Sequence, residues 1–583
     1  MRGLLALLPC FRPYRYRVLG GVIAILIRAL VGLMAPLLVG RAVDAFRRET
    51  SARALLTYAG LLVAVAIVQG VFSYWQRKVL VAVSRDIEFD LRNQYFAQLE
   101  RLPPSFYQTS YTGDLMARAT SDLQAVRMLC GPAIMYASNT IFEAAGSLFF
   151  MTRIHWQLTL LALATMPLVV VATQVFGQRI HRLFERVQER FAALSARAQE
   201  SFAGVRVVRA YAQESAESES FSRINDDYLY ENRRLIRWNS AFHPMLQMLA
   251  GVGFALVLWY GGELALSGEI TVGQFVTFNL FLGQLVWPMI AIGWVINLVQ
   301  RGAASFSRMR AVLDAVPAVG DEAPLEELGT VRGAISFRHL TFRYQGAPET
   351  APPALERLDL EIPAGHTVAV VGRTGAGKST LLSLVPRLAN PEQGSLFLDD
   401  HDVRRLALRD LRAAIAVVPQ ESFLFSGSLH DNIAFGRPEA TRVEVVRAAR
   451  LAGLEDDLTT FPAGLDTVVG ERGITLSGGQ KQRVALARAL LLERPILMLD
   501  DCLSAVDTQT EERILRNLRE VFARRTVFLV SHRVSTVRNA DTIVVLEQGR
   551  IAERGTHQEL VARGGLYAEL AERQQLEEEL AAV

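Results

Sequence analysis

The first half of the chain is dominated by long apolar runs, and the second half by short apolar runs separated by polar turns. Six of the long runs have roughly 20 mostly apolar residues each, enough to cross the hydrocarbon core of a bilayer as a helix. They predict membrane spans near residues 18–40, 54–76, 131–152, 156–177, 241–263 and 273–299. Beyond the last run the pattern is that of a soluble α/β domain. The 583 residues therefore divide into at least two domains.

A glycine-rich loop follows the apolar run at 367–371, which predicts a buried strand, and precedes a helical run at 381–385. This strand–loop–helix order suits a phosphate cradle, because glycines let backbone N–H groups close around phosphate oxygens and the helix N-terminus adds its dipole. Lys378 would reach the β- and γ-phosphates of ATP, and Ser379 would hold Mg²⁺. The predicted nucleotide-binding residues of the loop are Gly372, Arg373, Thr374, Gly375, Ala376, Gly377, Lys378, Ser379 and Thr380.

Further motifs surround this loop. The apolar run at 495–499 ends in Asp500 and Asp501, and Asp500 is placed to hold Mg²⁺. Upstream of it, Leu476-Ser-Gly-Gly-Gln480 opens a helical run at 481–488. Residues 334–344 alternate between apolar and polar positions, which predicts antiparallel strands at the start of the soluble domain.

The LSGGQ sequence, placed between a phosphate loop and an acidic strand end, resembles the signature of the ATP-binding cassette family, and the resemblance covers almost the whole chain. It implies that Tyr344 stacks on adenine, that Gln420 touches Mg²⁺ and the membrane domain, and that His532 contacts the γ-phosphate. Residues 467–473 resemble a loop found in exporters, and 504–507 resemble the loop that crosses between two cassettes. The resemblance also implies ATP binding by Ser477, Gly478, Gly479 and Gln480.

This resemblance implies a half-transporter of the type IV exporter class: an α-helical six-span transmembrane domain fused to an α/β P-loop ATPase cassette. Two halves would sandwich two ATP molecules, each between the phosphate loop of one chain and the signature of the other. ATP binding would close the cassettes and hydrolysis would reset them. Short helices near 113–120 and 207–216 would couple the two domains. The predicted divisions are a membrane domain at 1–318, a linker at 319–332, a nucleotide-binding domain at 333–572 and a helical tail at 573–583.

The charge pattern predicts the orientation in the membrane. The long connections at 77–130 and 178–240 carry many arginines, whereas the loop at 261–269 carries none, so the positive-inside rule places the long connections and the N-terminus in the cytoplasm. The arginines in the first short loop oppose this weakly, but six spans return the chain to its starting side and the cassette needs cytoplasmic ATP. We therefore predict a multi-pass protein of the cytoplasmic (inner) membrane, with a basic interfacial helix at 11–17.

Two charged residues lie inside predicted spans, Arg28 and Glu143. A charge at the bilayer centre costs at least about 2.5–3.5 kcal/mol on insertion scales, so it faces a cavity or a partner. One interpretation is a polar translocation path, and the other is an ion pair that only fixes packing. The last two spans are rich in Phe, Met and Trp, which suits either promiscuous apolar ligands or a lipid-facing surface.

Composition excludes some classes. The net charge is only +3, which argues against a nucleic-acid binder. Cys10, Cys130 and Cys502 lie far apart in the sequence, and their spacing predicts free thiols in a reducing compartment. Leu566, Leu570, Leu576 and Leu580 form a partial apolar stripe in the tail, which predicts either a helix that pairs with a partner's tail or a solvated helix.

One residue departs from the family pattern. The position after the Mg²⁺ aspartate usually holds a catalytic glutamate, and here it holds Asp501. A base that is one methylene shorter is displaced by about an ångström, and such a displacement can lower the rate on the order of 10²-fold. Either Asp501 is an adequate base, or this chain forms a heterodimer in which its own site, completed by catalytic residues Asp501, His532 and Gln420, hydrolyses ATP weakly. The second alternative resembles heterodimeric bacterial multidrug exporters.

Two functions follow from these predictions. The first is ATP-driven export of apolar or amphipathic compounds such as drugs, lipids or peptides, with ATP and Mg²⁺ as cofactors and a second half-transporter as partner. The alternative is an ATP-gated regulatory or channel subunit, in which slow hydrolysis favours long occupancy by the nucleotide.

Overall fold

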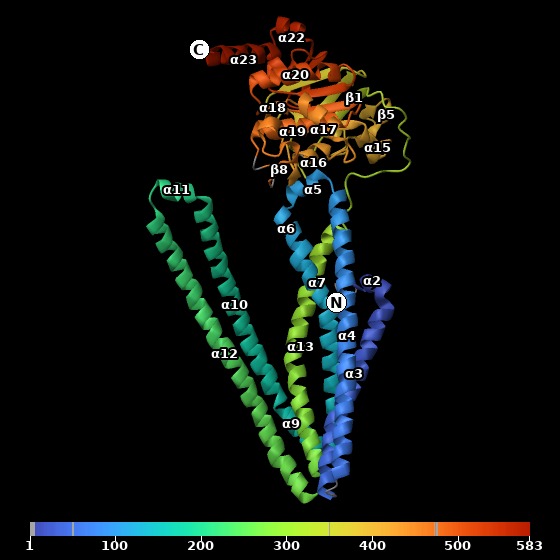
Figure 1. Cartoon of the computed structure of the whole chain (residues 1–583), viewed down its shortest axis with the longest axis vertical. Coiled ribbons are helices and arrows are strands. Elements are labelled where there is room, and N and C mark those ends of the chain that lie inside the picture. The colour runs from blue at the N-terminus through green and yellow to red at the C-terminus, as the bar shows by residue number, and fades with distance from the viewer. Residues whose placement is uncertain are drawn as a thin grey trace. The chain divides into compact units, whose positions relative to one another are not determined.

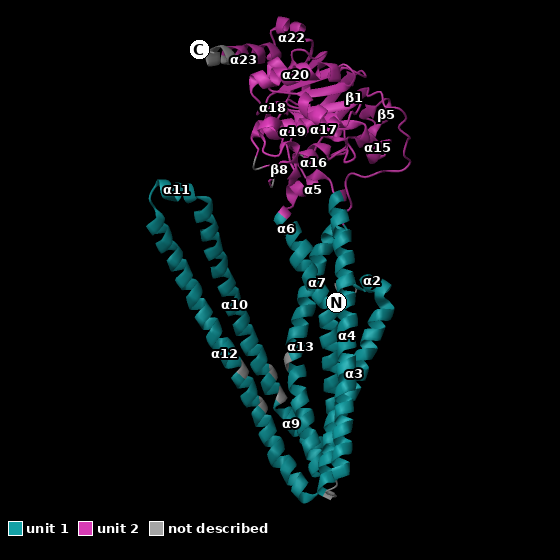
Figure 2. Ribbon diagram, in the orientation of Figure 1, with its two compact units in different colours: residues 1–100, 113–314 teal, residues 101–112, 315–583 magenta. Residues whose placement is uncertain are grey.

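A computed structural model describes residues 6–48, 52–344, 346–348, 350–470, 473 and 476–582, with the side chains of 166, 170, 243, 250, 290 and 577–582 left out. The chain forms two compact units (Figure 2). Unit 1 comprises residues 1–100 and 113–314, and unit 2 comprises residues 101–112 and 315–583. The sequence-based division placed 101–112 in the membrane domain and made 319–332 a separate linker. Both segments group with the cassette residues in the structure.

The regular elements in the described residues of unit 1 are all helices. The bounds of its helices are α2 (Leu8–Phe11), η1 (Arg12–Tyr14), α3 (Arg15–Arg48), α4 (Ala52–Arg101), α6 (Thr112–Ala117), η2 (Arg118–Asp122), α7 (Leu123–Met128), η3 (Leu129–Ala133), α8 (Ile134–Ile154), α9 (Trp156–Ala164), α10 (Met166–Ala203), α11 (Val205–Ala210), α12 (Glu214–Ser267) and α13 (Val272–Leu313). The predicted interfacial segment at 11–17 is indeed helical, spanning the end of α2, η1 and the start of α3.

Five helical stretches in the described residues are long and apolar enough to cross a membrane, at Leu8–Arg47, Ala52–Arg101, Trp156–Ala203, Glu214–Ser267 and Val272–Leu313. The predicted span at 131–152 is not among them, so the count of six is not confirmed. This segment falls on η3 and α8, where Asn139 and Glu143 lower the mean hydropathy. The long connections after the second and fourth predicted spans are helical, as predicted, because α4, α10 and α12 continue well beyond the apolar runs.

Helices α3, α8 and α13 pack against one another in unit 1, and α10 packs along α12 in a hairpin that α11 closes (Figure 1). Close approach of α3 and α13 depends on glycine: a Cβ on Gly40 would lie 1.9 Å from Thr277 Oγ1 and 2.5 Å from the carbonyl oxygen of Gly273. Beside this contact, the Asp44 carboxylate accepts hydrogen bonds from Thr271 Oγ1 (2.5 Å) and Gly273 N (2.7 Å). Asp44 thus fixes the start of α13 against α3.

The two charged residues of the predicted spans form an ion pair. Arg28 of α3 donates to Glu143 (2.8 Å) and to Asn139 (3.0 Å), both on α8. The two charged side chains are 20% and 26% exposed. The pair fixes α3 against α8, in agreement with the packing interpretation.

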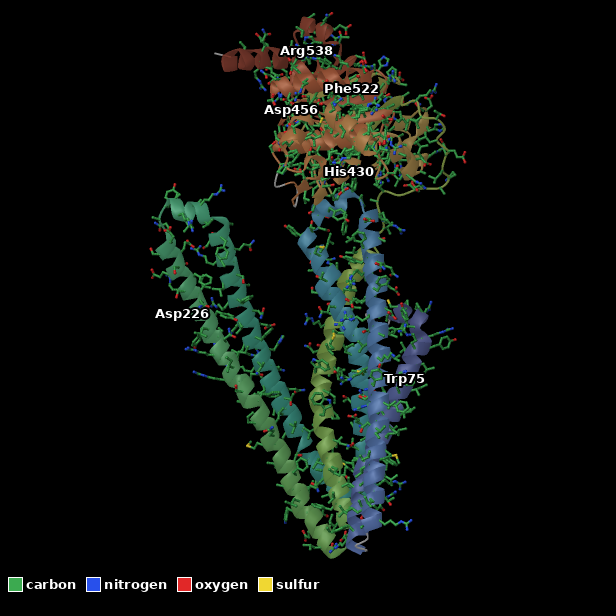
Figure 3. All side chains as sticks on the ribbon, viewed as in Figure 1. Trp75, Asp226, His430, Asp456, Phe522 and Arg538 are labelled. Atoms are coloured by element: carbon green, nitrogen blue, oxygen red, sulfur yellow. The ribbon has the colours of Figure 1, made fainter. Side chains whose placement is uncertain are left out.

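The aromatic residues of the last two predicted spans divide between two environments. Phe278 and Phe281 of α13 are fully buried in a cluster that joins α3, α8, α9, α12 and α13. Trp259 of α12 is 72% exposed and Trp287 of α13 is 59% exposed. Trp75 of α4, labelled in Figure 3, is 56% exposed. The exposed tryptophans provide apolar surface for lipid or for a second chain.

Unit 2 begins with a short helix, α5 (Pro104–Thr109), from the first long connection. Residues 113–120 are helical as predicted, in α6 and η2, but they begin a helical stretch that continues to Ile154 rather than forming a separate short helix. The additional helix α5 starts at Pro104, whose fixed φ suits the first position of a helix. The second predicted short helix, at 207–216, corresponds to α11, which ends at Ala210.

The rest of unit 2 is an α/β cassette with three sheets. The sheets have the orders β2-β1-β4-β5, β12-β11-β3-β10-β9-β6 and β7-β8. Their strands are β1 (Ile335–Phe342), β2 (Leu355–Ile362), β3 (Thr367–Gly372), β4 (Leu396–Leu398), β5 (His401–Asp402), β6 (Ile415–Val418), β7 (Gly427–Ser428), β8 (Val468–Val469), β9 (Ile496–Asp500), β10 (Thr526–Val530), β11 (Thr542–Glu547) and β12 (Arg550–Gly555).

The helices of the cassette cover these sheets. They are α14 (Lys378–Leu384), α15 (Leu408–Ala413), α16 (Leu429–Ala434), α17 (Arg442–Leu451), α18 (Glu455–Thr460), α19 (Gly478–Leu491), α20 (Thr508–Phe522), α21 (Val534–Val537), α22 (His557–Arg563) and α23 (Leu566–Ala582), with short turns η4 (Val403–Arg405) and η5 (Gly464–Asp466). Strands β3, β9 and β10 are apolar along nearly their whole length because the parallel part of the sheet is buried on both faces.

The segment before β1 is bound to the cassette. Arg387, which is fully buried, donates to the carbonyl oxygens of Gly320 (2.8 Å), Val403 (3.2 Å) and Leu406 (3.2 Å). Asn390 donates to the carbonyl oxygen of Ala318 (2.8 Å). The predicted linker is thus anchored along the cassette by Arg387 from outside it, and also by its own carboxylates, because Asp321 accepts from Leu408 N (2.8 Å) and Glu322 pairs with Arg404.

Candidate nucleotide-binding site

The glycine-rich loop connects β3 to α14, as the sequence predicted. Gly377, the last residue before α14, has φ +100°, and a Cβ there would lie 2.7 Å from the carbonyl oxygen of Ala354, so only glycine fits. Lys378 is buried, and its Nζ donates to the carbonyl oxygens of Gly372 (2.8 Å) and Arg373 (3.0 Å). Burial lowers the pKa of Lys378, and the nearby carboxylates of Asp501 and Asp500 oppose this change.

Four neighbouring strands supply the rest of the site at their carboxyl ends. In the order β3-β10-β9-β6, they lead into the glycine-rich loop, His532, Asp500 and Gln420 respectively. Asp500 pairs with Val530 in the β9–β10 register, and Val530 pairs with Val370 in the β10–β3 register. Parallel pairing therefore collects residues that are up to 160 positions apart in sequence, such as Gly372 and His532.

The two aspartates at the end of β9 differ in environment. Burial raises the pKa of Asp500 above its ordinary value, although a hydrogen bond from Ser379 opposes the rise. Asp501 has a left-handed backbone with φ +47°. Its backbone is held on both sides, because its N–H donates to the carbonyl oxygen of Val530 (2.9 Å) and its carbonyl oxygen accepts from Ser504 Oγ (3.0 Å). The backbone of Asp501 is therefore fixed.

A cleft of about 310 Å³ brings most of the predicted residues together. Tyr344 lies at its edge, 41% exposed, with its hydroxyl 2.9 Å from Thr380 Oγ1. Gly372 and Arg373 line an adjoining cleft together with His532. The predicted residues that line the first cleft are Tyr344, Thr374, Gly375, Gly377, Lys378, Ser379, Thr380, Gln420, Asp500, Asp501 and His532.

The signature residues lie outside that cleft, at the start of α19. Ser477 caps this helix through a reciprocal pair of contacts, in which Gln480 N donates to Ser477 Oγ (3.2 Å) and Ser477 N donates to Gln480 Oε1 (2.9 Å). Gln480 and Arg483 both donate to Asp457 of α18. The signature is thus an ordered helix start on the same cassette. Of the exporter-like loop at 467–473, residues 471 and 472 lie outside the described part of the chain.

Some residues around the site were not predicted from the sequence. Glu511, 2% exposed, accepts from Arg533 and from Thr536, next to His532. Gln574 of α23 accepts from Val534 N (2.6 Å). A buried glutamate at the start of a helix and a glutamine in a polar tail carry no motif, so only their three-dimensional placement reveals them.

The donors in the cleft fit a nucleotide with Mg²⁺. Ser379, Gln420 and Asp500 offer hard oxygen ligands of the kind that Mg²⁺ prefers. No group of three or more His, Cys, Asp or Glu residues in the described part of the chain is placed to hold a metal without help. Mg²⁺ would therefore depend on phosphate oxygens for part of its coordination, and when bound it would neutralise charge on those phosphates.

Comparisons with known proteins agree with this geometry. Residues 18–289 match the ABC transporter transmembrane region, and residues 355–504 match the ABC transporter family. The chain is 38% identical to the multidrug resistance-like ATP-binding protein MdlA of Escherichia coli, over 97% of this chain and 96% of that protein. It is 33% identical to an ATP-dependent lipid A-core flippase of Syntrophus aciditrophicus, over 97% and 93% of the two chains.

Among solved structures, a bacterial Atm1-family ABC exporter with ATP bound is similar, with a TM-score of 0.78 and 31% identity over 96% of this chain and 98% of that one. Fold and site together define a membrane transporter with a nucleotide-binding cassette. The chain belongs to the ABC transporter family, as a multi-pass half-transporter of the type IV exporter class whose cassette is an ATPase coupled to transport.

Proposed function

We propose that this chain is one half of a dimeric exporter that uses ATP and Mg²⁺ to move apolar or amphipathic compounds, such as drugs, lipids or peptides, across the cytoplasmic membrane. One observation carries the proposal. A single cleft gathers the phosphate loop, both aspartates, Gln420 and His532, while the signature residues lie outside it. Such a cleft needs the signature of a second chain to enclose its nucleotide. The names of the relatives, a multidrug resistance-like protein and a lipid flippase, support the substrate class.

The proposed membrane arrangement has six spans, with η3 and α8 supplying the one that falls short on hydropathy. An ion pair compensates for its polar character, because Arg28 of α3 pairs with Glu143 of α8 and also donates to Asn139. The arginines of the long helical connections support a cytoplasmic cassette and N-terminus. A multi-pass protein of the inner membrane with its ATP site in the cytoplasm follows from this arrangement.

We further propose that this chain's own site hydrolyses ATP weakly and that its partner is a different half-transporter. The Asp501 carboxylate is one methylene shorter than the usual glutamate, and its backbone is hydrogen-bonded on both sides. The backbone therefore cannot move to bring the shorter side chain's carboxylate further into the cleft. The intact signature at Ser477–Gln480 would serve the partner's site, as the capping of α19 supports.

Transport into inside-out vesicles tests the export function. Vesicles that contain the assembled transporter should accumulate a fluorescent lipophilic dye when ATP and Mg²⁺ are added, and vesicles with Lys378→Ala in this chain should not. Lys378 provides a point charge to the β- and γ-phosphates that no neighbouring side chain replaces. The alternative, an ATP-gated regulatory or channel subunit, predicts nucleotide-dependent conductance without accumulation against a gradient.

A further inference from the structure

The chain segment that follows His532 is fixed on one side by α20. Arg533 donates to the Glu511 carboxylate, and Thr536 Oγ1 donates to the same group. Arg533 also donates to the carbonyl oxygens of Val506 (3.2 Å) and Ser504 (3.4 Å), in the loop that precedes α20. Since Glu511 is only 2% exposed, its own two contacts are largely shielded from water, and the low local dielectric strengthens them.

On its other side the same segment is fixed by the C-terminal helix. Val534 is the first residue of α21, a helix of four residues whose first N–H groups have no partner within the helix. Gln574 of α23 accepts from Val534 N at 2.6 Å. Gln574, which is 40 positions away in sequence, therefore accepts a hydrogen bond from the first N–H of α21, the helix that follows His532.

Helix α23 is itself anchored where it begins. Tyr567 is fully buried, and its hydroxyl lies 2.8 Å from His557 Nδ1 of α22. The Glu553 carboxylate accepts from the N–H groups of Leu566 (2.6 Å) and Tyr567 (3.2 Å). Gln574 is two helical turns further along α23, so its position is set by a fixed helix start.

The same helix borders the site directly. A cleft of about 580 Å³ has Glu569, Leu570 and Arg573 of α23 on one wall. The other walls consist of Gly372–Thr374 of the phosphate loop and residues 531–534, which include His532. A change in the position of α23 therefore acts on the space next to the phosphate-binding residues as well as on the His532 segment.

We propose that Gln574 is a positioning residue for His532: by accepting from Val534 N it holds the His532 segment in place, so that the C-terminal helix controls how long this chain retains ATP. Glu511 holds the segment by accepting from Arg533. Gln574 of α23 holds it by accepting from Val534 N. The inference rests on the proposed function, because it assumes that His532 faces a bound nucleotide. Initial binding depends on Tyr344 and the phosphate loop, which Gln574 does not contact in the described structure.

The test uses the full-length chain in its assembled, reconstituted transporter and a photoreactive azido-ATP. Two quantities are measured on this chain: initial labelling on ice, which reports binding, and label retained after washing, which reports enclosure. Gln574→Ala should leave initial labelling within about twofold and speed nucleotide release by about two- to tenfold, the range expected for one lost hydrogen bond. Gln574→Glu should behave like the wild type, because a carboxylate oxygen accepts the same N–H. Glu572→Ala, an exposed change on the same helix, is the matched control.

The outcomes separate the two proposals. Release from Gln574→Ala at the wild-type rate would overturn the inference, as would a Gln574→Glu variant that releases nucleotide as fast as Gln574→Ala. A melting temperature that falls equally in Gln574→Ala and Glu572→Ala, with equal release, would reduce α23 to a structural role and would also overturn it. No initial labelling of the wild-type chain would instead overturn the proposed function, and the inference with it.

Discussion

At the scale of single residues, Asp501 determines the most about this chain's chemistry. Its φ of +47° lies in the left-handed region, and the contacts to Val530 and Ser504 hold the backbone there. A longer side chain on the same backbone would place its carboxylate further into the cleft that also contains Lys378 and His532. If the site is weak as proposed, restoring the methylene that is missing at position 501 should strengthen it.

Asp501→Glu should raise ATP hydrolysis by more than about tenfold when this chain is forced to pair with itself, because recovering part of a misplaced base's loss exceeds that factor. Self-pairing matters, since it supplies an intact signature to both sites. The measurement is steady-state phosphate release, with Asp501→Asn as the inactive reference. A wild-type self-pair that turns over ATP as fast as the Glu variant would show that Asp501 is an adequate base.

The ion pair between α3 and α8 gives a second prediction. Removing one partner leaves a half-buried charge unpaired, whereas removing both leaves none. Arg28→Met alone should therefore lower the melting temperature of the transporter more than Arg28→Met combined with Glu143→Leu, with a coupling energy within about 0.5–3 kcal/mol. If the double variant is stable yet loses transport of the dye, the pair has a role in the translocation path in addition to packing.

Residues with a motif around them were predictable, and residues without one were not. Lys378, Ser379 and Asp500 follow from the spacing of glycines and from an apolar strand that ends in acids, and the structure brings them into one cleft. Glu511 and Gln574 serve through contacts to a loop that is distant in sequence. No local pattern of sequence encodes such contacts, because they arise only when strands pair in a particular order.

At the scale of elements, the start of α19 gives a third prediction. Gly478→Asp in this chain should reduce the ATPase rate of the complex more than Asp501→Asn does, because in the proposed heterodimer the signature serves the partner's competent site and Asp501 serves the weak one. Ser477→Ala should have the same effect, although it also removes a helix cap, which costs about 1 kcal/mol. Melting temperatures therefore accompany the phosphate-release rates. Equal losses from Gly478→Asp and Asp501→Asn would indicate two equivalent sites and a homodimer.

The tail helix gives a fourth prediction, which the structure refines. The helix predicted at 566–580 is present in α23, but Leu580 lies among the residues whose side chains are not described, and Leu576 is 54% exposed. A deletion should spare Gln574, so we choose residues 576–583. If the tails of two chains pair, this deletion lowers the melting temperature of the dimer and leaves ATP retention unchanged. Unchanged melting would show that the tail is a solvated helix.

Element boundaries were less predictable than the elements themselves. Residues 113–120 are helical as expected, but they begin a stretch that continues to Ile154, and the separate short helix of this connection is α5, Pro104–Thr109, which starts at a proline. In the membrane domain, Asn139 and Glu143 place one expected span below the hydropathy of the other five. In both places, residues that hardly change the sequence pattern have a strong local effect. Pro104 acts on the backbone, and Asn139 and Glu143 act on the hydropathy of the span.

At the scale of the whole molecule, the division into units differs from the division by hydropathy. Residues 101–112 are as polar as their neighbours in the long connection, and nothing in their composition assigns them to the cassette. The linker before β1 likewise joins the cassette through Arg387, which lies well outside the linker. Membership of a compact unit depends on the surface that each segment meets, so composition alone does not reveal it.

The inclusion of residues 101–112 in unit 2 has a mechanical consequence. The polypeptide crosses between the two units three times, at 100/101, 112/113 and 314/315. A body held by one flexible tether can pivot and twist freely, whereas a body held at three points transmits torque as well as tension. Each of the three connections leads into a helix that belongs largely to unit 1, namely α4, α6 or α13. A cassette cut out at residue 315 would lack residues 101–112, which belong to its own unit, and all three connections to unit 1.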